Sequence, residues 1–277
     1  MRWMSATTKK HWLCTVLLFA AALATTLGLL AYAVPHLRTS FGQSGLSSFW
    51  NLGLGKARSQ TMIQGWAIPT SGESALISAI LVANSPQLIL SLIYVVFNSL
   101  ATRLLLAREW ASYARHRKPL RVSSPHGEQR STYFLQIPYR YGLPLMLYMT
   151  ALHWLISQSI FLAKVDVWDA NGVATQRESI TTCGFSPIGM IITSIVAACL
   201  ITTALALGMR GLDSEIPFAG SCSAAISAAC HAREDVSETA PLKWGAIPRE
   251  QELGEIVGHC AFESRDVEKP VPGNMYA

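Results

Sequence analysis

Polar side chains recur at steps of three and four within two apolar stretches of the sequence, and they form the first set of residues that could do chemistry. The first row is Asn84, Gln87, Ser91 and Asn98; the second is Thr150, His153 and Ser157, with Gln158 beside it. Such steps place side chains along one side of a helix. Because an amide or imidazole is costly in hydrocarbon, we expect the two rows to face each other or a wet cavity, with Pro86 releasing a backbone carbonyl for hydrogen bonding. The rows would then form a proton- or ion-responsive site, or only hold the helices together.

A second set is basic. Eight Lys and Arg residues lie between Arg103 and Arg140. Residues 103–118 predict an amphipathic helix that continues the preceding apolar stretch and is stopped by Pro119. A helix of this kind lies against anionic headgroups, so we expect the following residues at the membrane surface: Arg108, Arg115, Arg117, Lys118 and Arg121.

The polar residues that follow, 121–132, predict a mobile turn. Ser124 has an arginine three residues before it and a proline directly after it. Phosphorylation there would add negative charge among the arginines, although short patterns of this kind are frequent by chance.

Thiols and imidazoles in the C-terminal part form a third set. Cys230, His231, His259 and Cys260 could bind zinc, but their spacing does not match the usual zinc knuckles, and we assign no metal. We favour buried structural thiols. HExxH, GxxxxGK[ST], GxSxG and Rossmann glycine patterns are missing, so we expect no catalytic residue and no cofactor, and an enzyme is disfavoured.

Membrane helices must position these residues. Of the 277 residues, 51% are hydrophobic and 14% charged, which is depleted relative to the roughly 25% of soluble domains. The expected fold class is an all-α membrane protein with four transmembrane helices, a basic cytosolic loop and a mostly irregular acidic cytosolic tail. The expected domains are a cytosolic N-tail (1–10), a membrane domain (11–209) with spans at about 11–34, 75–102, 141–163 and 188–209, and a cytosolic C-terminal tail (210–277).

Two further apolar segments have alternative interpretations. The first apolar stretch is longer than the core of a signal peptide and is therefore interpreted as an anchor. Residues 216–232 are rich in Ala and Ser, and they are interpreted as cytosolic or interfacial rather than as a fifth span.

The distribution of Lys and Arg sets the orientation. The basic loop belongs in the cytosol, and four crossings then put both termini there as well. Eleven acidic and six basic residues follow Met209, so the tail and the basic loop either attract each other or are separately solvated. Only Cys183 would lie in an exoplasmic loop, so no disulfide framework is expected.

Several segments resemble a family of fungal multi-pass membrane proteins classed as a domain of unknown function. They are "ILVANSPQLILSLIYVVFNSL", the region from "LLAREWASYARHRKPL" to "YGLPLM", "LHWLISQSIFL", and "AACHA", "KWGAI" and "GHCAF" in the tail. Members of that family are longer, with further membrane segments upstream, so this chain resembles their C-terminal half. The resemblance implies a fungal membrane protein and carries over no catalytic or binding residue.

These observations leave two leading functions. The favoured one is a membrane scaffold or signalling component, because it uses the basic loop and acidic tail; the alternative is a subunit or fragment of a transporter or channel with a polar site between spans two and three. An intramembrane enzyme and a fragment without autonomous function rank below them. The expected partners are the lipid bilayer with its anionic headgroups and proteins at the cytosolic loop and tail, with no nucleic acid.

Overall fold

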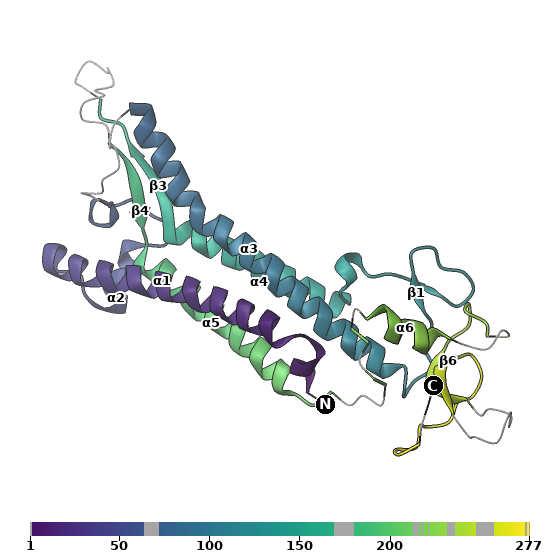
Figure 1. The fold of residues 1–277 in the computed structure, drawn as a ribbon. Coiled ribbons are helices and arrows are strands. Elements are labelled where there is room, and N and C mark those ends of the chain that lie inside the picture. Colours follow the sequence, from purple (N-terminus) through teal and green to yellow (C-terminus); the bar gives the residue numbers. More distant parts are fainter. Residues whose placement is uncertain are drawn as a thin grey trace. The chain divides into compact units, whose positions relative to one another are not determined.

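The computed structural model describes residues 2–63, 72–168, 180–212, 216–217, 219–220, 222–231, 236–247, 258–274 and 276. These residues are mostly helical (Figure 1). The α-helices are α1 (Lys9–Phe41), α2 (Gly45–Leu52), α3 (Gly72–Ser112), α4 (Tyr139–Ser159), α5 (Pro187–Met209) and α6 (Ser223–Cys230). Short 3-10 turns are η1 (Trp3–Ala6), η2 (Ser59–Thr61) and η3 (Phe134–Gln136).

Three two-stranded sheets accompany the helices, so the expectation of a purely helical protein was wrong. The strands are β1 (Arg121–Val122) with β2 (Arg130–Ser131), β3 (Ile160–Val165) with β4 (Ile180–Phe185), and β5 (Lys243–Ile247) with β6 (His259–Glu263). The first pair is parallel and the other two are antiparallel.

Among the described residues, three helices are long and apolar enough to cross a membrane, not the four expected. They are α1, α3 and α5. The third expected span, 141–163, corresponds to α4, which carries Arg140 in its first turn and the polar row around His153. Its helix also ends at Ser159, because the next six residues pair with β4 as a strand.

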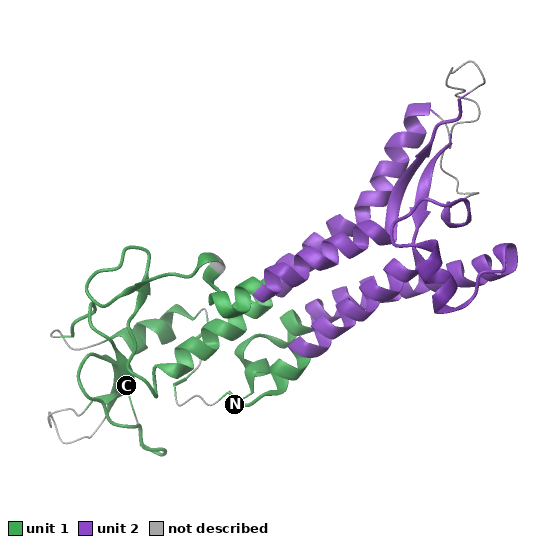
Figure 2. Ribbon diagram, turned by 180° about the vertical axis from the view of Figure 1, so that it is seen from behind, with its two compact units in different colours: residues 1–12, 98–143, 205–277 green, residues 13–97, 144–204 purple. Residues whose placement is uncertain are grey.

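The described chain forms two compact units (Figure 2). Unit 2 comprises residues 13–97 and 144–204. Its core contains Phe19 of α1, Leu90 and Ile93 of α3, Leu152 of α4 and Ala204 of α5. All four long helices therefore pack together in this unit, α4 included.

Unit 2 also contains the β3–β4 hairpin. Gly184 lies directly opposite Phe161, and a Cβ atom at that glycine would come within 2.4 Å of the Phe161 ring. The aromatic ring thus covers the glycine across the ladder. Ile63 extends the sheet, since its N–H donates to the Cys183 carbonyl at 2.9 Å.

The face of α3 that packs inward follows a regular pattern. Its buried residues recur at steps of three and four, with one seven-residue step: Ala75, Ala79, Ala83, Leu90, Ile93, Phe97, Leu100, Leu104, Ala107 and Ala111. This is the stripe that a helix with 3.6 residues per turn presents to a core. The helix is one continuous element whose final residues, from Asn98 onward, belong to unit 1.

Unit 1 comprises residues 1–12, 98–143 and 205–277. Ala6 and Trp12 pack there against Leu104 and Leu212. A second core joins Tyr113 just beyond α3 to Ala229 of α6, Trp244 of β5 and Phe262 of β6, among others. The basic segment after α3 and the described part of the tail are thus packed together.

The helix expected to reach residue 118 ends at Ser112. Beyond it the backbone pairs with the tail, because the Tyr113 carbonyl accepts from the Trp244 N–H at 3.0 Å, and Lys118 exchanges two 2.8 Å hydrogen bonds with Leu242. Tertiary pairing therefore replaces the helical pattern that the local sequence favours.

Candidate functional site

The polar row of α3 lies directly beside its buried stripe. Asn84, Ser91 and Asn98 each follow a buried residue by one position, a rotation of about 100° around a helix. Asn84 and Ser91 are exposed on the protein surface, while Gln87 and Asn98 are half-buried. The row therefore borders the helix packing and does not form part of it.

The Asn84-Ser85-Pro86 stretch satisfies its own backbone. Proline lacks an N–H, so Pro86 leaves the Val82 carbonyl without its helical donor. The Ser85 hydroxyl donates to that carbonyl at 3.0 Å, and the Asn84 amide donates to the Ile80 carbonyl at 2.8 Å. The carbonyl that Pro86 releases is thus bonded locally, which explains why polar residues can occupy the middle of an apolar helix.

The second row, on α4, is similarly placed. Thr150 is exposed and donates to the Met146 carbonyl, and Ser157 donates to the Trp154 carbonyl. His153 and Gln158 are half-buried. A Cβ atom at Gly55 would come within 2.1 Å of the Gln158 amide oxygen, so this side chain lies against the loop after α2.

Both rows bond within their own helices where the described residues show a bond. The Ser91 hydroxyl donates to the Gln87 carbonyl, as Thr150 and Ser157 do to theirs. A shared site of the two rows, with Asn84, Gln87 and His153 as its members, stays a prediction.

A buried polar contact that the sequence analysis missed joins α4 to α5. The Ser159 and Thr193 hydroxyls are 3.1 Å apart, and Ser159 also donates to the Leu155 carbonyl at 2.8 Å. Both residues are buried. Ser159 continues the stripe of Met149, Leu152 and Leu155, and following that stripe instead of the neighbouring polar row could have identified it.

The basic segment after α3 is largely engaged with the protein itself. Arg117 donates to the carbonyls of Ser264 and Arg265 and forms a 3.1 Å ion pair with Asp266. Lys118 donates to the Ser112 hydroxyl at 2.7 Å. These two residues connect the basic segment to the tail, and their expected role at the membrane surface stays a prediction.

Arg121 bonds within the basic segment. It donates to the Tyr133 hydroxyl at 2.5 Å and to the Ser131 carbonyl at 2.9 Å, and it lies 3.4 Å from the Glu109 carboxylate. Arg115 is exposed at the turn that ends α3. Ser124 is exposed in the bend that follows β1, accessible to a modifying enzyme, and its phosphorylation stays a prediction.

Arg108 differs from its basic neighbours. Its guanidinium donates to the Tyr141 hydroxyl and lies 5.6 Å from the centroid of the Trp3 ring. Arg140 lies over the same tyrosine, with its guanidinium carbon 4.8 Å from the Tyr141 centroid. Two arginines, from the end of α3 and the start of α4, therefore share one aromatic ring.

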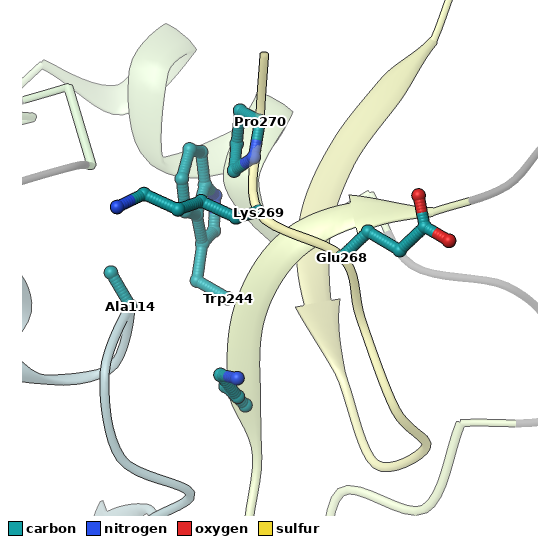
Figure 3. Close-up of a pocket in the computed structure, with 6 residues that line it drawn as sticks. Ala114, Trp244, Glu268, Lys269 and Pro270 are labelled. Carbon is teal, nitrogen blue, oxygen red and sulfur yellow. The ribbon is translucent and has the colours of Figure 1, made fainter.

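Among the described residues, two pockets lie between the tail and the chain around the end of α3. The larger, about 560 Å³, is lined mainly by apolar side chains, among them Trp110, Ile216, Trp244 and Val271. The smaller, about 110 Å³, has Trp244 on one side and Ala114 on the other; Lys269 extends across it, whereas Glu268 points away (Figure 3).

Tyr113 lies in the core that the basic segment and the tail share. Its hydroxyl donates to the Pro119 carbonyl at 3.1 Å, and its ring packs edge-on against Phe262. Burial, and then the nearby Glu109 carboxylate, raise the pKa of Tyr113 to about 12. The phenol is therefore a structural hydrogen-bond donor and not a proton carrier at neutral pH.

The four residues considered for zinc lie at the end of α6 and in β6. The His231 and His259 rings pack edge-on at 5.8 Å, and a ring nitrogen of His259 hydrogen-bonds the His231 carbonyl at 2.6 Å. The expectation of buried thiols was wrong for Cys230, which is exposed, while Cys260 is half-buried. Partial burial raises the pKa of both thiols. Within the described ranges, no three His, Cys, Asp or Glu residues are grouped to hold a metal ion. All six cysteines are free.

Three of the described helices are long and apolar enough to span a bilayer, which is consistent with a membrane protein. The chain belongs to the family described as a domain of unknown function (DUF8419), whose profile matches residues 1–276. No curated protein and no solved structure matches the chain.

Proposed function

We propose that the protein is a multi-pass membrane scaffold or signalling component whose basic segment and C-terminal tail form one folded cytosolic unit. The observation that carries this proposal is the shared core of Tyr113, Trp244 and Phe262, which joins the two segments through side chains and backbone. A folded polar unit continuous with a membrane helix is suited to binding other proteins. The anionic bilayer surface is its second partner.

The contacts within unit 1 support a topology in which both termini and the basic segment share one side of the membrane. The Trp3 N–H donates to the Arg210 carbonyl at 3.0 Å, which ties the start of the chain to the end of α5. Trp12 near the start of α1 packs in the same core as Leu104 and Ala107 of α3. Since α3 and α5 both end in unit 1, the chain must cross the membrane once more between them. We assign that crossing to α4, which packs among the other three long helices.

The distribution of positive charge supports placing unit 1 on the cytosolic side of the membrane. Every long helix has Lys or Arg at or beside its end in unit 1: Lys9 and Lys10 of α1, Arg103 and Arg108 of α3, Arg140 of α4 and Arg210 directly after α5. Positive charge next to membrane helices favours the cytosolic side. We propose a fungal membrane as the setting, on the resemblance of the quoted segments.

Protease protection tests this topology. A tag between Ser123 and Ser124, which are exposed, and a tag at the C-terminus should both be protected from external protease in intact cells, while a tag near Gly172, outside the described residues, should be cleaved. Protection of the Gly172 tag together with cleavage of the other two would reverse the orientation.

The transporter or channel alternative is separated by reconstitution. A scaffold should leave the ion and proton permeability of vesicles unchanged. An increase in permeability that His153→Gln and His153→Ala both abolish would establish the alternative instead.

A further inference from the structure

The arginines of unit 1 differ in what their guanidinium groups contact. Arg117 and Arg121 direct their N–H donors at carbonyl, hydroxyl and carboxylate oxygens of the protein. Arg108 donates to one acceptor, the Tyr141 hydroxyl, and Arg140 donates to none among the described residues. Most N–H donors of this second pair thus remain available to a ligand.

The second pair also forms no ion pair in the part of the chain that the structure describes. Ion pairs there join Arg117 to Asp266, Arg121 to Glu109 and Lys164 to Asp166, and none involves Arg108 or Arg140. Both guanidinium groups instead lie over aromatic rings, at 6.0 Å and 4.8 Å from the Tyr141 centroid. Two like charges gathered on one ring favour an anion that would neutralise them.

The site lies within unit 1, at the ends of two long helices. Arg108 is in the last turns of α3 and Arg140 in the first turn of α4. Trp3, the second aromatic neighbour of Arg108, is hydrogen-bonded through its backbone to Arg210 directly after α5. Tryptophan, tyrosine and arginine at the ends of apolar helices are typical of the headgroup level of a bilayer.

We propose that Arg108, Arg140 and Tyr141 bind a phosphate group of an anionic lipid headgroup. Planar guanidinium groups bind phosphate oxygens bidentately, and an exposed phosphate monoester carries more than one negative charge at neutral pH. The aromatic rings hold the two cations in place, with Tyr141 fixing Arg108 through its hydroxyl. This inference rests on the proposed membrane function and adds to it a ligand class and a defined site.

Lipid titration of the purified full chain in detergent tests the site. Wild-type protein should bind phosphatidic acid, which presents a phosphate monoester, more tightly than phosphatidylglycerol and much more tightly than phosphatidylcholine. Arg108→Gln and Arg140→Gln should each weaken binding of phosphatidic acid by about tenfold, because each removes a charge-assisted contact. Inorganic phosphate serves as competitor: displacement of the lipid at equal concentration would assign the site to free phosphate, and resistance assigns it to the lipid.

Matched variants separate a site from diffuse charge. Arg130→Gln removes the same charge from an exposed position of the same unit and should bind phosphatidic acid as wild type does. Arg108→Lys keeps the charge without the planar group and should lose the preference for the monoester over the diester while retaining the preference for anionic lipid. Equal losses in Arg130→Gln and Arg108→Gln, or equal affinity of wild-type protein for phosphatidylcholine and phosphatidic acid, would overturn the proposal.

Folding and topology are controlled separately. Helix content and the thermal midpoint of each variant identify any that do not fold, and Arg108→Lys keeps the test informative if Arg108→Gln is one of them. Lipid binding in detergent does not depend on orientation, so its failure would leave the tag experiment unaffected, and an inverted topology would leave the lipid affinity unchanged.

Discussion

Pro86 interrupts the hydrogen bonding of α3, because proline has no backbone N–H to donate to the Val82 carbonyl. The preceding residue supplies the missing hydrogen bond, since the Ser85 hydroxyl donates to the Val82 carbonyl. An unbonded carbonyl in hydrocarbon is unfavourable, and side-chain hydrogen bonds in membranes contribute about 0.6 kcal/mol on average. Ser85 therefore acts together with Pro86, because its hydroxyl replaces the N–H donor that the proline lacks.

Ser85→Ala should lower the free energy of unfolding by about 0.6–1 kcal/mol, because it leaves the Val82 carbonyl without a donor. Pro86→Ala supplies a backbone N–H for the same carbonyl, so adding Ser85→Ala in that background should change stability little. Unfolding of the purified protein in mild detergent measures all four combinations. The same loss in both backgrounds would contradict the pairing.

At this scale the sequence located polar residues but not their bonds. The steps of three and four correctly predicted that Asn84, Ser91 and Thr150 lie on helices. Their acceptors are carbonyls one turn earlier in the same helix, and residue spacing does not distinguish that bond from one to a facing helix. Tyr141 was missed because its importance depends on two arginines 32 positions apart in the sequence, Arg108 and Arg140.

A buried pair of hydroxyls joins α4 to α5. Ser159 and Thr193 lie within hydrogen-bond distance, and Ser159 is the last residue before the chain changes from helix to strand. The pair thus lies at the point where α4 gives way to β3.

A double-mutant cycle should detect this pair. Ser159→Ala and Thr193→Val each remove one partner, and the coupling free energy between them should be about 0.6 kcal/mol, since both act on one hydrogen bond. Ser157→Ala, on the neighbouring exposed row, should show no coupling to Thr193→Val. Additive losses from Ser159→Ala and Thr193→Val would show that the bond contributes nothing to helix packing.

Element boundaries could be predicted where composition changes sharply, and not where distant segments decide. Pro187 and Met209, the bounds of α5, lie within one residue of the predicted span 188–209. The end of α4 and the end of α3 were both predicted too late. In each case the following residues pair with a strand or bridge far along the sequence, and local pattern carries no information about that partner.

On the scale of the whole molecule, the tail covers the aromatic end of α3. Trp110 and Tyr113 each pack edge-on against Phe262, and Trp244 is buried in the same core. The opposite charges of the tail and the basic segment allowed an electrostatic attraction between them. The structure adds a largely apolar contact together with the Arg117–Asp266 ion pair, which charge counts alone could not predict.

Trp244→Ala should detach the tail from the basic segment. Truncation of a buried tryptophan costs about 3–5 kcal/mol, and the Tyr113 ring would lose its cover. Limited proteolysis of the purified protein should then cut faster within residues 113–138. Trp50→Ala removes an exposed tryptophan from unit 2 and should leave this rate unchanged. Equal rates for wild type and Trp244→Ala would show that the tail does not protect the segment.

Unit 1 is assembled from three stretches of chain, residues 1–12, 98–143 and 205–277. A ribosome makes them at widely separated times, with long apolar helices emerging between them. The Trp110 and Tyr113 rings therefore have no packing partners until Trp244 and Phe262 have been synthesised. Contacts this distant in sequence form late, and exposed aromatic surface recruits chaperones and proteases in the meantime. Folding of unit 1 is consequently completed only after translation reaches the tail, and a nonsense mutation before residue 244 would yield a chain whose Trp110 and Tyr113 rings lack their partners, which quality control can recognise.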